Sequence, residues 1–318
     1  MKHIFTVIFL SSISLSIFAQ KHEGIVTPAD YTNPVGDTLK ILTWNVEHFV
    51  DAHNSPYINS DRENEATPSK VNQRIDQLVA ALKKIDADVV VLQEFESQAF
   101  LQKIAEEKLP EQKYRFFASV PSPTWYMNVV VMSRVSIGAI HGYGSVTTPV
   151  KGSLGENGLP ETQNRINTRM LSVEVLVNAR YSFILHGVHL KAGRGARNEA
   201  MREGQIDFLL GQCARFYKED RQTNQLILGD LNCTPESKEF QKLLKDRKGV
   251  RFIDPLADTA VMSHPADQPE RRIDHILIDK NMAKELIPNS VKMATVFSPT
   301  QMRAMSDHLP VVAQFLVK

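Results

Sequence analysis

The sequence predicts an α/β protein in which two packed β-sheets carry helices on their outer faces. Strand-like runs follow one another directly in some parts of the chain, whereas strand–helix units alternate in others, and this mixture favours two sheets with external helices. The run Val89-Val90-Val91-Leu92 is continuously apolar, which indicates a strand buried on both faces. Apolar residues at helical spacing across 71–85 predict one of the covering helices.

The composition is that of an ordinary globular protein, with 42% hydrophobic and 23% charged residues in 318. Lys and Arg number 37 and Asp and Glu number 36, so the net charge is close to zero. This balance does not support a bulk electrostatic attraction to nucleic acid or to an anionic membrane, and any affinity for anions must be local. Cys213 and Cys233 are too few for a disulfide scaffold and do not indicate a zinc site, and whether they pair stays open.

Residues 1–19 are typical of a signal peptide. Lys2 gives a short basic start, an apolar stretch follows from Ile4, and Ala19 places a small residue at the cleavage position. The alternative is an uncleaved membrane anchor, but the stretch is short and interrupted by serines. We therefore expect a secreted or periplasmic protein, a monomer, with no stable membrane insertion after cleavage.

Residues 20–37 contain glycines and prolines and predict an extended linker. Residues 38–318 show no repeat, low-complexity block or interior linker, so they predict a single domain. Thr67-Pro68 supplies the start of the first helix. The other expected helices lie at 99–107, 199–217 and 237–244. The expected strands lie at 39–44, 89–92, 114–118, 128–133, 170–177, 181–190, 225–228, 273–278 and 310–316. Residues 51–69 and 144–168 predict long loops, and the second is expected to shape the substrate groove.

Oxygen-bearing side chains occur where the predicted strands end. They are Asn45, Glu94, Asp230, Asn232 and Asp307. Mg²⁺ prefers one or two carboxylates together with waters and phosphate oxygens, so we expect Glu94 and Asp307 as direct ligands, with Asn45 in or beside the metal shell. Asp230 and Asn232 have the spacing that points two side chains the same way. One is expected to orient or deprotonate a water while the other holds the phosphate.

Two histidines supply the other half of the predicted chemistry. His189 and His308 suit charge neutralisation and proton transfer at neutral pH. Asp274 is expected to orient one of the two imidazoles. Five other histidines lack such settings, and we interpret them as structural or surface residues: His48, His141, His186, His264 and His275.

A local basic cluster follows His189. Lys191, Arg194 and Arg197 lie in one turn-rich segment of a protein with balanced charge, which indicates an anionic substrate docked there. The alternative is a solvated basic loop. Tyr126 and Arg169 are two further candidates for substrate contact.

These motifs occur in an order that resembles a known family. The ordered set is Trp44-Asn45, Gln93-Glu94, Gly229-Asp230-Leu231-Asn232, Ile273-Asp274 and Ser306-Asp307-His308-Leu309-Pro310. It resembles the endonuclease/exonuclease/phosphatase superfamily with the DNase I-like fold. The resemblance implies a four-layer α/β/β/α sandwich, in which 38–318 is the catalytic domain, with Mg²⁺ or Mn²⁺ dependence and in-line attack of water on phosphorus.

The resemblance also implies roles for matching residues. Asn45, Glu94 and Asp307 match metal-site positions, whereas Asp230 and Asn232 match positions that orient water and phosphate. His308 matches the phosphate-contacting histidine or general base, paired with Asp274. Histidine at position 189 is similar to that of DNase I, bacterial sphingomyelinases and inositol-polyphosphate phosphatases.

Three functions follow from this sequence. We expect a secreted metal-dependent nuclease, with nucleic acid as the phosphoester partner. The alternative is a phosphatase or phosphodiesterase acting on lipid or soluble phosphoesters. A lipid enzyme of that kind is expected to show an exposed apolar hairpin, and the sequence offers only the weak run 121–126. A catalytically silent binding module is disfavoured because the ligand set has no gaps.

Overall fold

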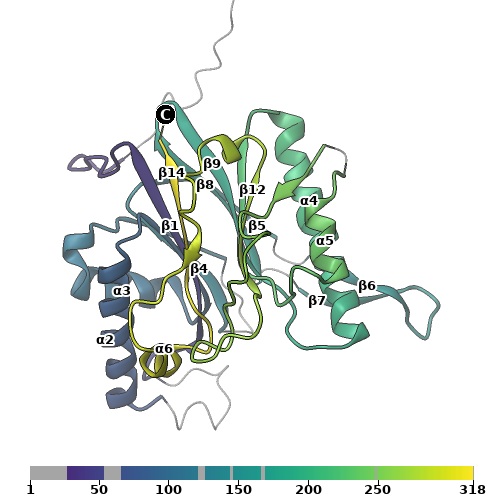
Figure 1. The fold of residues 1–318 in the computed structure, drawn as a ribbon, viewed down its shortest axis with the longest axis horizontal. Helices are drawn as coiled ribbons and strands as arrows, with labels where there is room; N and C mark the ends of the chain where they lie inside the picture. The colour runs from purple at the N-terminus through teal and green to yellow at the C-terminus, as the bar shows by residue number, and fades with distance from the viewer. Residues whose placement is uncertain are drawn as a thin grey trace, which may run out of the picture.

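Two six-stranded β-sheets lie face to face at the centre of the computed structural model, with helices on their outer sides (Figure 1). The structure describes residues 27–53, 66–120, 126–143, 146–165, 169–247 and 249–317. The predicted signal peptide and residues 121–125 of the weak apolar run 121–126 lie outside these residues. Among the helices of the described residues, none has the length and apolar character needed to span a membrane.

The first sheet has the strand order β13-β14-β1-β2-β4-β3. In that order its strands are Lys292–Met293, Val311–Leu316, Thr38–Phe49, Val89–Phe95, Asn128–Ser133 and Phe116–Ser119. β1 and β2 are parallel, whereas the other pairs are antiparallel. The C-terminal strand therefore pairs with the first strand, and Thr38 lies opposite Leu316.

The second sheet has the order β11-β12-β10-β9-β8-β5. Its strands are Phe252–Ile253, Asp274–Asp279, Asn224–Asp230, Tyr181–His189, Met170–Asn178 and Ser136–Gly142. β9 and β10 are its parallel pair. Each sheet thus has one parallel pair near its middle, and the side chains that follow those strands emerge at the same edge of the sandwich.

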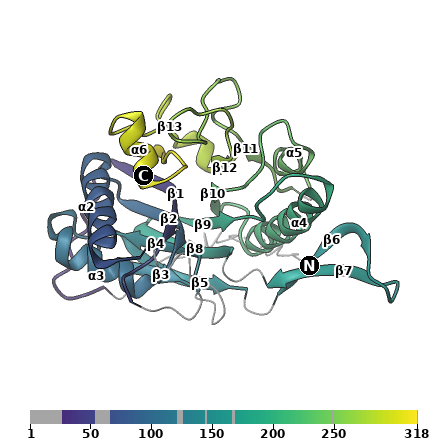
Figure 2. The same ribbon diagram turned by 90° about the horizontal axis from the view of Figure 1, so that it is seen from below.

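The helices form the two outer layers (Figure 2). On the first sheet lie α2 (Pro68–Ile85), α3 (Gln98–Lys108) and the short α6 (Pro299–Met305), and on the second lie α4 (Ala196–Glu219) and α5 (Lys238–Leu244). Thr67 caps α2 by accepting a hydrogen bond from the backbone nitrogen of Lys70, and Pro68 occupies the first turn. The start predicted for this helix from Thr67-Pro68 is therefore confirmed.

Three apolar cores separate the layers. The central core lies between the sheets and includes Ile41, Val91, Leu185, Leu228 and Ile276. A second core joins α2, α3 and α6 to the first sheet, and a third joins α4 and α5 to the second sheet. The predicted four-layer α/β/β/α sandwich is confirmed.

The segment 144–168 is not the structureless loop that the sequence predicted. Its described part forms a β-hairpin of β6 (Thr147–Leu154) and β7 (Pro160–Arg165), which packs on α4 and projects from the body (Figures 1 and 2). Gly204 of α4 permits this contact, since a Cβ there would lie 2.0 Å from the backbone oxygen of Pro149. The periodicity of this segment is weak because only Thr148, Val150 and Gln163 of its described residues are buried, so composition suggested a loop.

Sequence reasoning also missed four other elements: β11 and β13 have only two residues each, β5 is mostly exposed, and α6 is a helix of seven residues. The described part of the predicted linker, 27–37, lies against the body. Asn33 donates a hydrogen bond to the backbone oxygen of Val177 at 2.6 Å, and Asp30 pairs with Arg115. Cys213 and Cys233 are both buried free thiols, which resolves the pairing that the sequence left open.

Candidate active site

Strand periodicity carries four predicted residues to one place. Along β1, Leu39 and Ile41 face the central core, so Asn45 points to the same inner side at the far end of the strand. The same alternation places His189, the last residue of β9, on the same inner face of the strand as Phe183 and Leu185. The inward-facing residues of β10 finish at Asp230, and those of its antiparallel neighbour β12 begin opposite it at Asp274. These four polar side chains therefore close one end of the central apolar core.

Glu94 reaches this site against the alternation of its strand. Val90 and Leu92 of β2 belong to the outer core, so a regular strand would turn Glu94 away from the inner side. Glu94 instead has a left-handed φ of 58°, and the pairing of β2 with β4 shifts register between Leu92 and Phe95. This backbone irregularity, of a kind that clusters at functional sites, turns the carboxylate toward Asn45 and His189.

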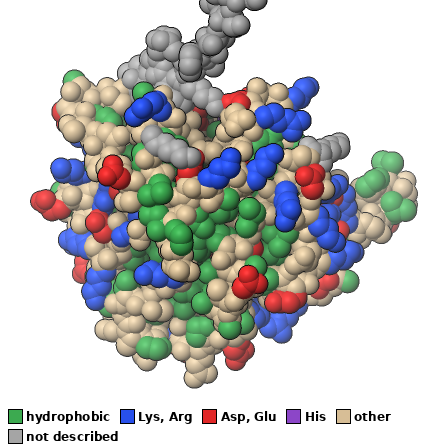
Figure 3. Space-filling view, turned by 45° about the horizontal axis from the view of Figure 1, so that its top comes forward, with side chains coloured by type: hydrophobic (Ala, Val, Ile, Leu, Met, Phe, Trp, Pro, Cys, Tyr) green, Lys and Arg blue, Asp and Glu red, His purple; other side chains and the backbone are tan. Residues whose placement is uncertain are grey.

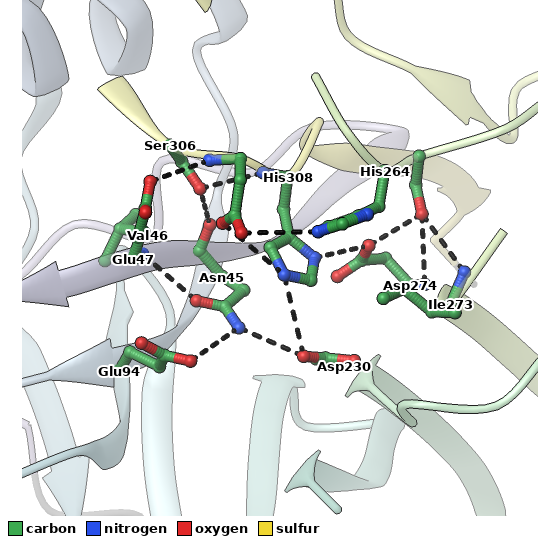
Figure 4. Close-up of polar contacts among 12 residues, drawn as sticks. Asn45, Val46, Glu47, Glu94, Asp230, His264, Ile273, Asp274, Ser306 and His308 are labelled. Carbon is green, nitrogen blue, oxygen red and sulfur yellow. Dashed lines mark hydrogen bonds and ion pairs between the residues drawn. The ribbon is translucent and has the colours of Figure 1, made fainter. Parts of the chain in front are cut away.

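Asn45 joins the carboxylates of the two sheets (Figure 4). Its Nδ2 donates to Glu94 Oε1 at 3.2 Å and to Asp230 Oδ2 at 3.0 Å. Its Oδ1 accepts a hydrogen bond from the backbone nitrogen of Glu47 at 3.1 Å. Because Asn45 is 1% exposed, this amide is fixed by packing as well as by hydrogen bonds.

Asp230 lies at the centre of the cluster. Its Oδ2 is 3.7 Å from His189 Nε2 and 3.8 Å from His308 Nε2. Asn232 follows in a left-handed turn, donating from its backbone nitrogen to Oδ1 at 2.8 Å and from Nδ2 to Oδ2 at 3.0 Å. The two residues therefore lie side by side, as their spacing predicted.

The two histidines have opposite electrostatic settings. Burial lowers the pKa of His189 more than the Glu94 carboxylate raises it, so this imidazole is neutral at neutral pH. Burial also lowers the pKa of His308, but the carboxylates of Asp274 and Asp230 outweigh it and raise the pKa to about 10. His308 is therefore a cation at neutral pH.

Asp274 holds the His308 ring in place. Its Oδ2 is 2.8 Å from His308 Nδ1 and accepts a second hydrogen bond from the Ser263 hydroxyl at 2.6 Å (Figure 4). Burial raises the pKa of the neighbouring Asp230, and the positive charge of His308 offsets only part of that effect. A carboxylate with a raised pKa beside a fixed cation is suited to accept a proton.

Asp307 is held from two sides. Its backbone nitrogen donates to Glu47 Oε2 at 3.0 Å, and its Oδ2 lies 3.2 Å from His264 Nε2. Its Oδ1 is 3.6 Å from His308 Nε2 and so faces the catalytic cluster. Burial raises the pKa of Asp307, but the hydrogen bond from His264 and the charge of His308 bring the pKa below its ordinary value.

Two of the predicted substrate contacts lie close to these acids. Tyr126 is buried, and its hydroxyl is 2.6 Å from the Nδ1 atom of His48. The backbone nitrogen of His48 in turn donates a hydrogen bond to Glu94 Oε2 at 2.9 Å. Arg169 precedes β8 and donates a hydrogen bond to the backbone oxygen of Leu190 at 3.4 Å. Its guanidinium also interacts electrostatically with the carboxylates of Glu94 and Asp230. Both side chains therefore lie beside the Glu94 end of the cluster.

The basic segment after His189 divides between two environments. Arg194 lines the cavity over the site, whereas the Lys191 ammonium donates to the backbone oxygen of Ala192 at 3.0 Å. Arg197 pairs with Glu161 on the β6–β7 hairpin, with 2.9 Å between Nη1 and Oε2, so the structure does not bring it to the site. The basic cluster predicted from the sequence is therefore not one continuous surface, since Arg194 lies at the cavity and Arg197 lies at the hairpin.

The cavity over the catalytic cluster has a volume of about 560 Å³. Its lining includes Glu94, His189, Asp230, Asp307 and His308 together with Arg194, Arg202 and Arg271. Arg202 is buried and bonded to Glu239 at 2.9 Å, so it forms part of the wall. No described residue of the β6–β7 hairpin is among the residues that line this cavity, so the role expected of 144–168 in shaping the substrate groove stays a prediction.

Sequence reasoning missed two histidines and one acid at the site. His48 and His264 were interpreted as structural or surface residues, but they contact Glu94 and Asp307. Glu47 bonds Asp307 and pairs with Arg303 at 2.8 Å. Glu47 and His48 lie two and three positions after Asn45, and both have a left-handed φ of 47°. Only their closeness to Asn45 in the sequence offered a signal.

The donor set fits a hard divalent cation. Glu94 and Asp307 both line the cavity and Asn45 hydrogen-bonds Glu94, so carboxylate oxygens of the kind that Mg²⁺ prefers are present at the site. Two tighter groups, Asp230 with Asp274 and His308, and His264 with Asp307 and His308, have their ligand atoms within 4.8 Å of one another. In the first group the His308 Nδ1 atom lies 2.8 Å from Asp274 Oδ2, so this nitrogen is already hydrogen-bonded.

Acids, an amide and histidines thus converge where two sheets of a four-layer sandwich end, which defines a metal-dependent phosphoesterase. Residues 42–308 match the model of the Endonuclease/Exonuclease/phosphatase family. The chain belongs to this family and is a phosphoric ester hydrolase of a generally metal-dependent class. Comparison with curated proteins gave no match.

Solved structures share the fold at low identity. An endonuclease/exonuclease/phosphatase from Beutenbergia cavernae is 20% identical with a TM-score of 0.56, covering 89% of this chain and 72% of that one. D. rerio TDP2 complexed with single strand DNA product is 17% identical with a TM-score of 0.57, covering 89% and 100%. The human Nocturnin catalytic domain with bound sulfate anion is 15% identical with a TM-score of 0.57, covering 88% and 95%.

Proposed function

We propose that this protein is an exported, Mg²⁺-dependent nuclease that hydrolyses phosphodiester bonds by in-line attack of water. The observation that carries the proposal is the setting of Asp230. This buried carboxylate lies within 3.8 Å of a neutral histidine, His189, and a cationic one, His308, under a cavity with arginine in its wall. In-line hydrolysis needs a proton acceptor and a fixed positive charge at neighbouring positions.

Each residue has a defined task in this proposal. Asp230, with its raised pKa, orients the attacking water and accepts its proton, and Asn232 keeps the carboxylate in place. His308, held by Asp274, contacts a phosphate oxygen as a cation. His189, neutral beside Glu94, contacts a second phosphate oxygen. Glu94 and Asp307, with Asn45 beside them, would hold Mg²⁺ or Mn²⁺, which would supply Lewis-acid charge to the phosphate.

Nucleic acid as the substrate is supported by the related fold of D. rerio TDP2, a structure of which contains a single strand DNA product. Arg194 and Arg271 in the cavity lining add local positive charge to a chain of net charge +1. Binding is then expected to be local to the cleft and sensitive to salt. Export is supported by the signal-like pattern of residues 1–19.

A second candidate, a phosphodiesterase acting on lipid phosphoesters, is favoured by the β6–β7 hairpin. Leu154 and Leu159, at the two sides of its turn, are 68% and 62% exposed. Figure 3 shows hydrophobic side chains at the end of this projection from the body. The hairpin is anchored beside the start of α4, since Gln163 donates to the backbone oxygen of Met201 at 2.7 Å. This is the exposed apolar hairpin that the sequence did not reveal.

A substrate panel tests both candidates. Purified protein lacking residues 1–19 is assayed on plasmid DNA, RNA, sphingomyelin vesicles, inositol phosphates and bis-p-nitrophenyl phosphate, each with Mg²⁺, Mn²⁺ or EDTA. Cleavage of DNA or RNA that EDTA abolishes supports the nuclease. Turnover of sphingomyelin vesicles without cleavage of DNA or RNA supports the lipid enzyme and overturns the nuclease, provided that a Leu154→Ser/Leu159→Ser variant loses the vesicle activity but still hydrolyses bis-p-nitrophenyl phosphate.

A further inference from the structure

His264 contacts both residues of the Asp307–His308 pair, although it comes from a different loop. Its Nε2 lies 3.2 Å from Asp307 Oδ2, and its ring meets the His308 ring edge-on, with centroids 4.8 Å apart and planes at 67° (Figure 4). The side chain of His264 is 19% exposed and that of Asp307 is 28% exposed. The role of the His264–Asp307 contact depends on whether His264 Nε2 carries a proton.

Arg271 determines that proton position. Its Nη2 lies 3.0 Å from His264 Nδ1. A guanidinium can only donate hydrogen bonds and does not lose its proton in proteins, so Nδ1 must be the acceptor and carry no hydrogen. The ring hydrogen of neutral His264 is then on Nε2, from which it is donated to Asp307 Oδ2.

The backbone fixes the partners of this chain. The backbone nitrogen of His264 donates to the oxygen of Arg271 at 3.0 Å, and the nitrogen of Arg271 donates to the oxygen of His264 at 3.0 Å. This reciprocal pair is the hydrogen-bonded register of antiparallel strands, which places the two side chains on the same side of the bridge. The contact between Arg271 and His264 is therefore set by the fold.

Two consequences follow for Asp307. Although the ligand atoms of His264, Asp307 and His308 lie within 4.8 Å, the proton on His264 Nε2 prevents that nitrogen from binding a metal. The hydrogen bond also occupies Oδ2 and leaves Oδ1, 3.6 Å from His308 Nε2, facing the catalytic cluster. The two oxygens of the Asp307 carboxylate therefore differ: Oδ2 is hydrogen-bonded to His264, whereas Oδ1 faces the catalytic cluster.

We propose that Arg271 and His264 are positioning residues that orient the Asp307 carboxylate so that Oδ1 alone is presented to the metal. The inference rests on the proposed metal-dependent hydrolysis. Arg271 and His264 would then fix the orientation of a metal ligand without contacting the reacting atoms themselves.

Three variants and one control test the chain. His264→Phe keeps a ring against His308 but removes both hydrogen bonds, whereas His264→Gln retains an amide donor for Asp307. Arg271→Met removes the group that fixes the tautomer. His141→Phe, at an exposed histidine packed on Phe216 of α4, is the matched control for the substitution itself. Thermal unfolding without metal reports whether each variant folds.

The first readout is Mn²⁺ affinity by titration calorimetry of the same protein used for kinetics. His264→Phe is expected to weaken Mn²⁺ binding roughly 10-fold to 100-fold, the range for residues that orient metal ligands, with His264→Gln restoring most of the loss. If the pair acts as one unit, Arg271→Met adds little in the His264→Phe background. Mn²⁺ affinity and kcat at the wild-type level in His264→Phe would overturn the proposal, as would a loss of thermal stability without a change in affinity.

The second readout is the nitrogen NMR spectrum of His264, which does not depend on metal or activity. The expected signals are an unprotonated Nδ1 and a protonated Nε2, and a protonated Nδ1 in the wild-type protein would overturn the proposal even if His264→Phe failed to fold. Failure of the proposed function looks different. In that case the wild-type protein itself binds no Mn²⁺ and shows no EDTA-sensitive turnover, while the NMR signals still report the hydrogen-bonded pair.

Discussion

Asn45 Nδ2 and Asp230 Oδ2 are 3.0 Å apart, and this hydrogen bond joins the ends of β1 and β10, strands of different sheets. The catalytic cluster is therefore assembled across the sandwich, with the Asn45 amide as the link. Because both residues are 1% exposed, the link is shielded from water and its geometry depends on the packing of the two sheets.

Removing the central carboxylate or its neutral neighbour should abolish most turnover. Asp230→Ala and His189→Ala are each expected to lower kcat by at least about 10², the scale for lost acid–base or charge stabilisation. Steady-state kinetics on bis-p-nitrophenyl phosphate measures this, with the exposed Glu111→Ala as a control. Either variant with near-wild-type kcat would remove that residue from the catalytic set.

Glu94 is expected to act through the metal. Glu94→Ala should shift the Mg²⁺ titration of activity to higher concentration, because the carboxylate that faces Asn45 and His189 is lost. Activity measured across Mg²⁺ concentrations separates this from a fall in kcat at saturating metal. A titration midpoint equal to that of the wild type would place Glu94 outside the metal shell.

Gly204 and Gly211, on the same helix, should respond oppositely to alanine. A Cβ at Gly204 would lie 2.0 Å from the oxygen of Pro149, so Gly204→Ala must displace the β6–β7 hairpin and should destabilise the protein by about 1–3 kcal/mol. A Cβ at Gly211 meets no atom within 4 Å, so Gly211→Ala should stabilise by about 0.5–1 kcal/mol. Urea unfolding compares them, and equal effects would contradict the close contact of hairpin and helix.

Stability should fall in mild acid because of buried neutral histidines. Burial lowers the pKa of His186 from 6.5 to about 4 in the folded protein, so the unfolded chain binds a proton first as pH falls. This contribution to stability is complete above pH 6.5 and is lost as pH falls toward 4, at up to about 1.4 kcal/mol per pH unit for one proton.

The variant His186→Gln isolates this contribution. His186 bonds Ser172 at 2.7 Å and Gln225 at 3.1 Å, so the variant should be less stable at pH 7 but show a shallower loss between pH 6.5 and 4. Urea unfolding at several pH values provides the slopes. Parallel slopes for the two proteins would show that the fold does not lower the pKa of His186.

The sequence was sufficient for the fold class and for most of the site because both follow from strict periodicity. Alternation along β1, β9 and β10 carries Asn45, His189 and Asp230 to the inner side after runs of core residues. Glu94 does not follow this alternation, which alone would turn its side chain outward. Its role as a metal ligand was predicted only from its position at the end of a strand. Its inward direction depends on a left-handed backbone that no local pattern encodes.

The residues that sequence reasoning missed depend on contacts between distant segments. His264 and Asp307 are 43 positions apart, and Glu47 is 260 positions from Asp307. A lone histidine or glutamate in a loop has many possible partners, and only the folded chain selects one. The β6–β7 hairpin was missed for a related reason, since its stability comes from packing on α4 rather than from its own pattern.

The pairing of the first and last strands makes this protein a good subject for circular permutation. Thr38 lies opposite Leu316, and the nitrogen of Val317 donates to the oxygen of Asp37 at 2.9 Å, so a short peptide can connect the two positions (Figure 1). New ends can then be opened in the exposed turn between Leu154 and Leu159. A chain rearranged in this way retains every strand pair of both large sheets, and only the connection within the hairpin is cut.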